Sequence, residues 1–157
     1  EYFSLCMYDY IAPGYDELYG EEQLKKLKII APIIKGKVLD LGAGTGIVAK
    51  NFPNVTSLDP SEDMLKFAPE PKTVGSAETI PFSARSFDTI VSLTALHHCD
   101  IDQVIKEFKR MQPKNMGFSV LKKSKKCKEI VEKLQKEFDM KLIEEEKDRI
   151  LIKDTKS

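Results

Sequence analysis

A run of glycines beside two acidic residues is the part of the sequence best suited to hold a ligand. Asp40 is followed by glycine at every second position, in the pattern Asp-x-Gly-x-Gly-x-Gly over residues 40–46. Glycine has no Cβ atom, so such a turn can be tight and its backbone N–H groups can lie against a ligand. A second acid, Asp59, ends the next apolar segment, and its carboxylate can accept hydrogen bonds from hydroxyl groups.

The segments around this turn predict the start of a parallel α/β sheet. Residues 38–41 form a short apolar run typical of a buried strand, and a helical pattern opens at Ile47. In a doubly wound sheet, a turn of this kind follows the carboxyl end of its strand, where ligands bind. A second apolar run over 55–58 ends at Asp59. Both acids are therefore expected at one edge of the sheet.

These motifs resemble class I S-adenosylmethionine (SAM)-dependent methyltransferases, whose first motif is an acid followed by G-x-G-x-G. A second stretch, with Ala77-Glu78, Pro81-Phe82 and Phe87-Asp88 in order, is similar to a segment of small-molecule methyltransferases. Ser76 replaces the Asp or Asn that usually bonds the adenine amino group, although its hydroxyl can still accept one hydrogen bond. The chain looks most like the small-molecule branch related to the quinone-biosynthesis methyltransferases.

The resemblance implies SAM as the cofactor and gives its contacts. Asp40 would face the amino-acid end of SAM, Asp59 would hold the ribose hydroxyls, and Ala77 and Glu78 would border the adenine. In this family a Tyr-Asp segment near the start folds over the cofactor, and both Tyr8-Asp9 and Tyr15-Asp16 fit it. The expected cofactor site comprises Asp40, Gly42, Ala43, Gly44, Thr45, Gly46, Asp59, Pro60, Met64, Ser76, Ala77, Glu78 and Tyr15.

Two histidines, His97 and His98, follow the strand expected over residues 86–93. The resemblance places this stretch beside the methyl-donor pocket, where His98 is the candidate catalytic residue. It would act as a general base or orient the acceptor. A hydrogen bond from a ring to the backbone at the strand end also explains at least one of the two. Adjacent residues rarely converge on one ion, and no spaced ligands occur elsewhere, so no metal site is predicted.

The fold class predicted for the whole chain is α/β. The resemblance implies a Rossmann-like, doubly wound, seven-stranded sheet, mostly parallel with a C-terminal antiparallel strand and with helices on both faces. One domain is expected over residues 1–157, with 1–19 as an N-terminal lid that Pro13-Gly14 breaks. Further strands are expected at 73–75, 118–121, 140–144 and 149–153, and helices at 21–34, after Ser61, at 100–111 and at 127–138.

Composition limits the partners. Basic and acidic residues both number 25, so the overall charge indicates no polyanionic partner. No apolar run approaches membrane-spanning length, so no membrane is expected. The three cysteines show no C-x-x-C spacing and are expected to be reduced thiols in a cytoplasmic protein. Nothing in the pattern specifies an oligomeric state.

A lysine run bears on the methyl acceptor. Lys122, Lys123, Lys125 and Lys126 precede the last expected helix. Such a run is most simply a solvated face. Cations at a helix N-terminus oppose its dipole, however, so an anionic acceptor or an RNA backbone is a second interpretation. A small-molecule acceptor leads, with tRNA or a protein side chain as the alternative.

Two other functional classes stay open. An NAD-dependent oxidoreductase would use Gly44-x-Gly46-x-x-Ala49 as a loose dinucleotide fingerprint, although no second domain is available to hold a reducible substrate. A SAM-binding subunit that needs a partner for activity is suggested by the small size. It is also suggested by residues 112–117, which replace the family's Leu-Lys-Pro-Gly-Gly turn in an eroded form.

Overall fold

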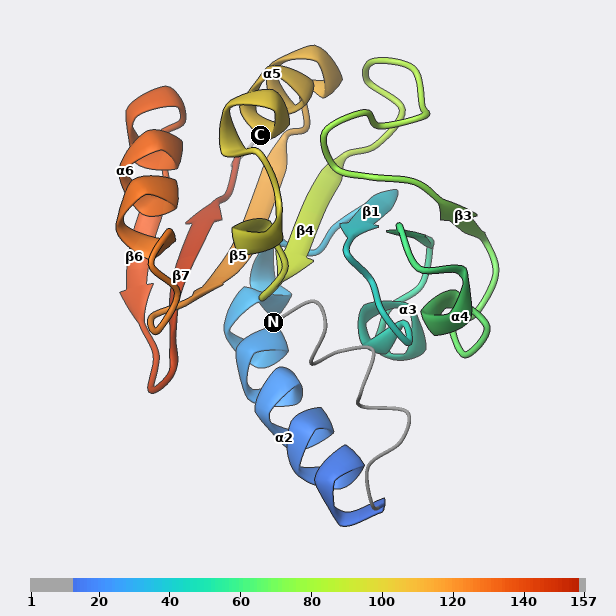
Figure 1. Cartoon of the computed structure of the whole chain (residues 1–157). Coiled ribbons are helices and arrows are strands. Elements are labelled where there is room, and N and C mark those ends of the chain that lie inside the picture. Colours follow the sequence, from blue (N-terminus) through green and yellow to red (C-terminus); the bar gives the residue numbers. More distant parts are fainter. Residues whose placement is uncertain (1–12, 156–157) are drawn as a thin grey trace.

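The computed structural model of the chain describes the backbone of residues 13–155 and the side chains of residues 20–155 (Figure 1). A seven-stranded sheet with the order β3-β2-β1-β4-β5-β7-β6 forms its centre. All neighbouring pairs from β3 to β5 are parallel, whereas β7 is antiparallel to both β5 and β6. The predicted sheet is thus confirmed. The strands are β1 (Val38–Leu41), β2 (Val55–Asp59), β3 (Lys72–Val74), β4 (Thr89–Leu93), β5 (Asn115–Leu121), β6 (Lys141–Glu144) and β7 (Asp148–Lys153).

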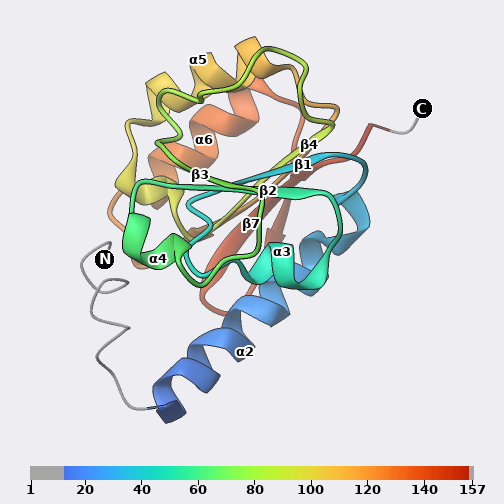
Figure 2. The same ribbon diagram turned by 90° about the vertical axis from the view of Figure 1, so that its right-hand side faces the viewer.

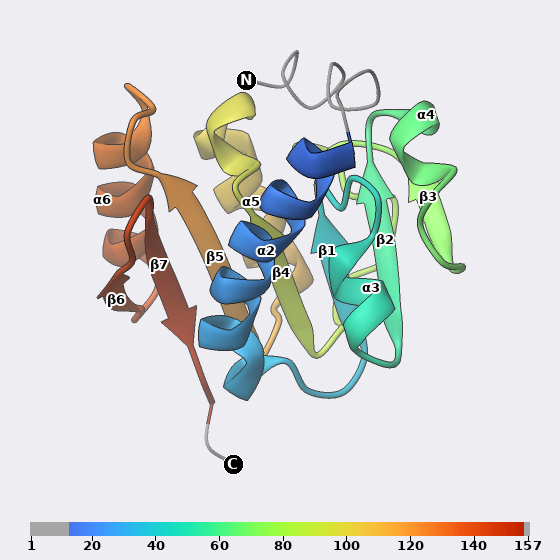
Figure 3. The same cartoon turned by 90° about the horizontal axis from the view of Figure 1, so that it is seen from below.

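Helices cover both faces of the sheet (Figures 2 and 3). One face carries α2 and α3 and the other carries α5 and α6, as successive side chains of β1 show. Val38 packs with residues of α2 and α3, whereas Leu39 packs with residues of α5 and α6. The helical elements are α2 (Pro13–Ile30), η1 (Ala31–Ile33), α3 (Ile47–Asn51), α4 (Glu62–Leu65), η2 (Leu96–His98), α5 (Ile101–Met111) and α6 (Cys127–Glu137).

The first helix is longer than the sequence pattern predicted. It begins at Pro13 instead of residue 21, so Pro13-Gly14 does not break this segment. Proline is tolerated in the first turn of a helix because the N–H group it lacks would have no partner there. Tyr15 therefore lies in α2, but its side chain and Tyr8 are outside the described residues. The lid over the cofactor stays a prediction.

The fifth strand also begins earlier than predicted. Residues 115–117, expected to be part of a turn, form the first part of β5. A Cβ atom at Gly117 would lie 2.4 Å from Ile30 and 2.8 Å from Ile33, so the glycine lets the end of α2 and η1 pack closely on the strand. The packing of α2 therefore decides the conformation of this segment.

The parallel strands bring the sequence motifs to one edge of the sheet. In the register of β1 with its neighbours, Asp40 pairs with Ser57 of β2 and with Val91 of β4. The glycine turn, Asp59 and the loop after Leu93 consequently leave the sheet side by side. No helix within residues 13–155 is long and apolar enough to cross a membrane.

Candidate cofactor and active site

Two adjoining cavities lie at the carboxyl ends of β1, β2 and β4, and Gly42 lines both. The first has a volume of about 560 Å³, the second, on the α2 side, about 240 Å³. The first is lined by Leu41, Gly42, Asp59, Pro60, Ser76, Ala77, Glu78, Ser92, Ala95, Leu96, His98 and Cys99. The second is lined by Gly20, Gln23, Asp40, Gly42, Ala43, Gly44, Thr45, Ile47, Lys50, Met64 and Leu93. Of the predicted cofactor residues whose side chains the structure describes, only Gly46 lines neither.

The glycine turn depends on backbone conformations that other residues rarely adopt. Gly42 and Gly44 have φ angles of +68° and +58°. A Cβ atom at Gly42 would lie 2.5 Å from the Cβ atom of Ala95, so the loop after β4 comes very close to the turn. Gly46 has a φ angle of +85° and also serves packing, because a Cβ atom there would lie 2.8 Å from Ala68. The glycines thus shape the wall between the two cavities.

The backbone N–H groups of the turn are used within the fold. Those of Gly42 and Ala43 donate to the carbonyl of Leu58 at 2.8 and 3.1 Å. The N–H group of Gly44 donates to a carboxylate oxygen of Asp59 at 2.9 Å, and that of Gly46 donates to the carbonyl of Ala43 at 3.0 Å. The expectation that these N–H groups lie against a ligand is therefore wrong for these residues.

Asp59 links the turn to the start of α4. Its Oδ2 accepts from the N–H of Gly44, and its Oδ1 accepts from the N–H of Ser61 at 2.8 Å. Only 4% of the residue is exposed, so Asp59 is also a buried part of the fold. Burial raises the pKa of Asp59, and the two backbone hydrogen bonds oppose this rise. Each carboxylate oxygen retains a second acceptor position, so Asp59 can still hold a pair of hydroxyls.

Asp40 is the corresponding acid of the second cavity. Its position in β1, two residues after Val38, turns it toward α2 and α3. Burial, and next the charge of Asp59, raise the pKa of Asp40 well above its ordinary value. A carboxyl group that is costly to ionise alone is stabilised by a cation beside it. The ammonium group at the amino-acid end of SAM fits this requirement.

The segment after β3 forms the outer wall of the first cavity. Ser76, Ala77 and Glu78 line it together with Pro60, as expected for an adenine subsite. Glu78 also accepts a hydrogen bond from the N–H of Asp100 at 3.1 Å, which ties this wall to the start of α5. This structural contact of Glu78 was not evident from the sequence, because the two residues belong to different motifs.

The two histidines have different surroundings. His98 is half-buried and lines the first cavity, whereas His97 is buried and lines none of the cavities described here. Their rings lie 4.0 Å apart between centroids. Burial, and next the charge of Glu78, raise the pKa of the neighbouring Cys99 thiol to about 12. Cys99 is therefore a neutral thiol near pH 7 and a poor nucleophile.

A third, polar cavity of about 320 Å³ shares His98 and Cys99 with the first. Lys126 lines it, whereas Lys122 pairs with Glu144 at 3.1 Å and Lys123 and Lys125 are exposed outside the three cavities. The structure thus divides the lysine run. The third cavity is lined by His98, Cys99, Asp100, Ile101, Asp102, Lys126, Glu129, Ile130 and Lys133. Among residues 20–155, whose side chains the structure describes, no group of three or more His, Cys, Asp or Glu side chains could hold a metal ion.

Sequence reasoning missed Gln23, Ser92, Ala95 and Lys50 as lining residues. Gln23 belongs to a helix whose apolar spacing predicted only a structural role. Ser92 and Ala95 flank the end of β4 and carry no distinctive chemistry. The only signal for Ser92 and Ala95 was that they lie near His98 in the sequence. This did not indicate the direction of their side chains.

Comparison with known proteins agrees with the fold. Residues 39–115 match a family described as a methyltransferase domain. An uncharacterized protein of Methanocaldococcus jannaschii is 37% identical over 113 residues, which are 66% of this chain and 45% of that protein. Demethylmenaquinone methyltransferase of Thermotoga maritima is 32% identical over 128 residues, 69% of this chain and 56% of that enzyme. The chain spans about half the length of the curated relatives it matches.

A solved structure shows the same fold over nearly the whole chain. It is a SAM-dependent methyltransferase of Thermotoga maritima, a possible histamine N-methyltransferase, which superposes with a TM-score of 0.69 at 17% identity. The match covers 88% of this chain and 92% of that protein. The family match, the fold and the residues around both cavities lead to one conclusion. The chain belongs to the class I SAM-dependent methyltransferases.

Proposed function

We propose that the chain transfers the methyl group of SAM to a small polar molecule. The observation that carries this proposal is the pair of cavities joined at Gly42. Asp59 offers acceptor positions for a ribose diol in the first, and buried Asp40 offers an acidic partner for an ammonium group in the second. SAM is a nucleoside joined to an amino acid, so it needs both an acceptor for its ribose hydroxyls and an acidic partner for its ammonium group.

The chemistry requires alignment more than activation. SAM supplies an already activated methyl group, which an acceptor atom takes in an in-line displacement. The chain must hold donor and acceptor about 3 to 3.5 Å apart, an effect that can lower the barrier by several kcal/mol. Leu41, Gly42 and Ala95 would provide the narrow wall that fixes the donor.

His98 is the group proposed to receive a proton from the acceptor. It lines both the first cavity and the polar third cavity, so an acceptor in the third would reach the methyl group past this ring. A neutral imidazole can remove a proton from the acceptor as the methyl group arrives. Cys99, in the same wall, cannot share this role while its thiol stays protonated.

The charges around the third cavity favour a small polar acceptor over RNA. Lys133 pairs with Asp102 at 2.9 Å and with Glu129 at 3.5 Å, which leaves Lys126 as the lining lysine without an ion pair among the described residues. Binding of an RNA backbone needs several free cations along one track. A single unpaired cation beside carboxylates suits a compact acceptor that carries both a positive and a negative charge.

The dinucleotide alternative is disfavoured by the glycine turn. A pyrophosphate is held by free N–H groups at such a turn. Here those of Gly42, Ala43, Gly44 and Gly46 donate within the protein. A partner-dependent SAM-binding subunit stays the second candidate, because a putative methyltransferase of similar fold is known in complex with the Haloferax volcanii Trm112 methyltransferase activator.

The proposal is tested by supplying the purified chain with methyl-labelled SAM and separate pools of small metabolites, tRNA and proteins. Label should enter the metabolite pool without added protein fractions. Asp59→Asn protein serves as the matched control and should transfer far less label. Transfer only to tRNA or protein would contradict the small-molecule acceptor. Transfer that requires a protein fraction from cell extract would favour the partner-dependent subunit.

A further inference from the structure

Gln23 is a buried amide at the wall of the second cavity. It lies in α2, is 4% exposed and lines the cavity together with Asp40 and the glycine turn. Its Oε1 accepts a hydrogen bond from the ammonium group of Lys26 at 3.0 Å. Its Nε2 makes no hydrogen bond with any of the described residues. An amide donor is therefore available on a residue that faces the cofactor cavity.

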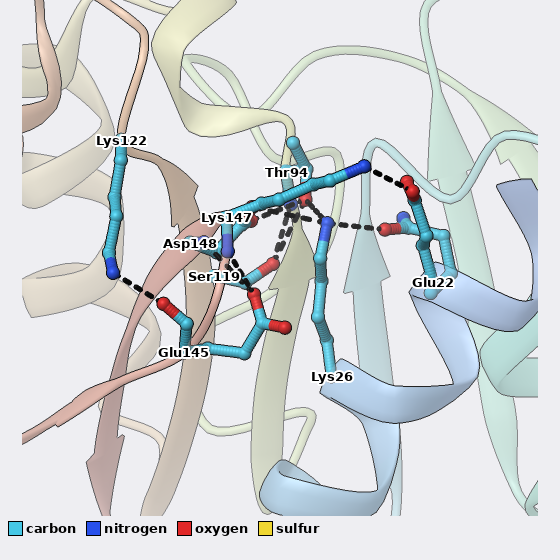
Figure 4. Close-up of polar contacts among 9 residues, drawn as sticks. Glu22, Lys26, Thr94, Ser119, Lys122, Glu145, Lys147 and Asp148 are labelled. Carbon is cyan, nitrogen blue, oxygen red and sulfur yellow. Dashed lines mark hydrogen bonds and ion pairs between the residues drawn. The ribbon is translucent and has the colours of Figure 1, made fainter.

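Lys26 fixes which end of this amide faces the cavity. A lysine ammonium group can only donate, so Gln23 must present its oxygen to Lys26 and direct its NH₂ group elsewhere. Lys26 is itself held on two further sides. Its Nζ lies 3.1 Å from Oγ1 of Thr94 and 3.2 Å from Oδ1 of Asp148, a residue with no exposed surface (Figure 4).

The partners of Lys26 are equally restrained. The Thr94 hydroxyl donates to Oδ2 of Asp148 at 2.8 Å, and the backbone N–H of Thr94 lies 2.9 Å from both the carbonyl and the hydroxyl oxygen of Ser119. Such a network in a low-dielectric interior holds its members in one arrangement. It joins α2 to the ends of β4, β5 and β7, and so restrains the side of α2 that faces the cavity.

The turn supplies few donors to the cavity. The N–H groups of Gly42, Ala43 and Gly44 are occupied within the fold. A carboxylate entering the second cavity must therefore find donors on side chains as well, and a carboxylate accepts strongly from an amide N–H. With Asp40 as the acidic partner of an ammonium group, the cavity then offers complementary groups for both charges of an amino acid.

We propose that the Gln23 amide binds the carboxylate of the methyl donor's amino-acid end, with Lys26 as the positioning residue. This inference rests on the proposed function, because it takes SAM to occupy both cavities. It makes the N-terminal helix α2 a determinant of cofactor specificity. Ligands that carry the carboxylate should be preferred over nucleosides that lack it.

The test compares SAM with 5′-methylthioadenosine, which has the nucleoside and the sulfur but no amino-acid end. Dissociation constants are measured by calorimetry for the unmodified chain, Gln23→Leu and Gln23→Glu. The Gln23→Glu variant keeps an acceptor for Lys26 and removes the NH₂ donor, so it should preserve the fold. Lys25→Gln is the matched control, because Lys25 is an exposed cation on α2, two residues after Gln23, and lines none of the three cavities.

Both Gln23 variants should bind SAM about ten- to a hundredfold more weakly, while their affinity for 5′-methylthioadenosine stays within about twofold. Lys26→Met should shift the ratio of the two affinities in the same direction. Lys25→Gln should change it little. An unchanged SAM affinity in folded Gln23→Glu, or an equal loss for both ligands, would overturn the assignment. If the unmodified chain bound neither ligand, the proposed function would fail together with it.

Discussion

Replacing Asp59 by Asn changes one atom of a side chain that serves the fold and the proposed cofactor site together. In the unmodified chain its two oxygens accept from the N–H groups of Gly44 and Ser61 at 2.9 and 2.8 Å. The single amide oxygen of the substituted side chain can accept from only one of these, and its NH₂ group then faces the other N–H donor. One charge-assisted hydrogen bond is lost, and so is the negative charge offered to a ribose diol.

The size of the effect follows from these contacts. A hydrogen bond to a charged group contributes about 1.5–3 kcal/mol. Since burial raises the pKa of Asp59, removing its charge offsets part of the loss, and we expect stability to fall by about 1–2 kcal/mol. For a domain of this size the melting temperature should drop by about 2–8 °C. SAM affinity should fall roughly ten- to a hundredfold, because the diol loses its anionic acceptor.

Thermal unfolding and calorimetric titration with SAM on the same protein sample measure both effects. Asp63→Asn is the control, since Asp63 lies in α4, just after Asp59 in the chain, and its side chain, paired with Lys66, is 80% exposed. It should leave melting temperature and SAM affinity nearly unchanged. A folded Asp59→Asn protein with lower melting temperature but unaltered SAM affinity would refute the ribose assignment. Asp59 would then serve only to hold the glycine turn.

Three further sets of substitutions test the remaining assignments. His98→Ala should lower the single-turnover methyl-transfer rate by about 10² or more with SAM affinity retained, whereas His97→Ala should mainly lower stability; small, equal effects would remove the catalytic role. Asp40→Asn should stabilise the cofactor-free protein at neutral pH but have little effect below pH 3.8. Burial raises the pKa of Asp40 in the folded protein, so the stability of the unmodified protein falls as pH rises through that raised value. Denaturant unfolding at several pH values measures this difference, and a pH-independent effect would contradict it. Lys26→Met should cost about 3–5 kcal/mol by leaving the Asp148 charge buried alone, and the joint replacement with Asp148→Leu should cost less than the two single changes added.

The sheet was predictable because its signals are local. Each strand is a short apolar run, and the glycine turn follows the first of them at once. The errors occurred where tertiary packing overrides a local signal. Pro13 and Gly14 resemble a break, yet they begin a helix that packs along the sheet. Gly117 lies in a strand that packs against Ile30, and its missing side chain leaves room for this contact. Local propensity contains no information about such partners.

The sequence predicted several residues of the cofactor site but not their burial or their hydrogen bonds. Asp40 and Asp59 were identified from their places at strand ends, and both line the cavities. The sequence did not reveal that Asp59 is buried and bonded to the turn, because its partners lie in another loop. Gln23 was missed for a related reason. Its proposed role depends on Lys26, which orients its amide group. The polar network of Lys26 joins four elements that are far apart in the chain.

Calorimetric titration of the unmodified chain with SAM, S-adenosylhomocysteine and NAD tests the central claim, that the two cavities joined at Gly42 hold one SAM molecule. SAM and S-adenosylhomocysteine should each bind saturably with one molecule per chain and compete with one another. NAD should not bind, because the N–H groups of the glycine turn are already occupied. Saturable binding of NAD, or no saturable binding of SAM by the folded chain, would contradict the account.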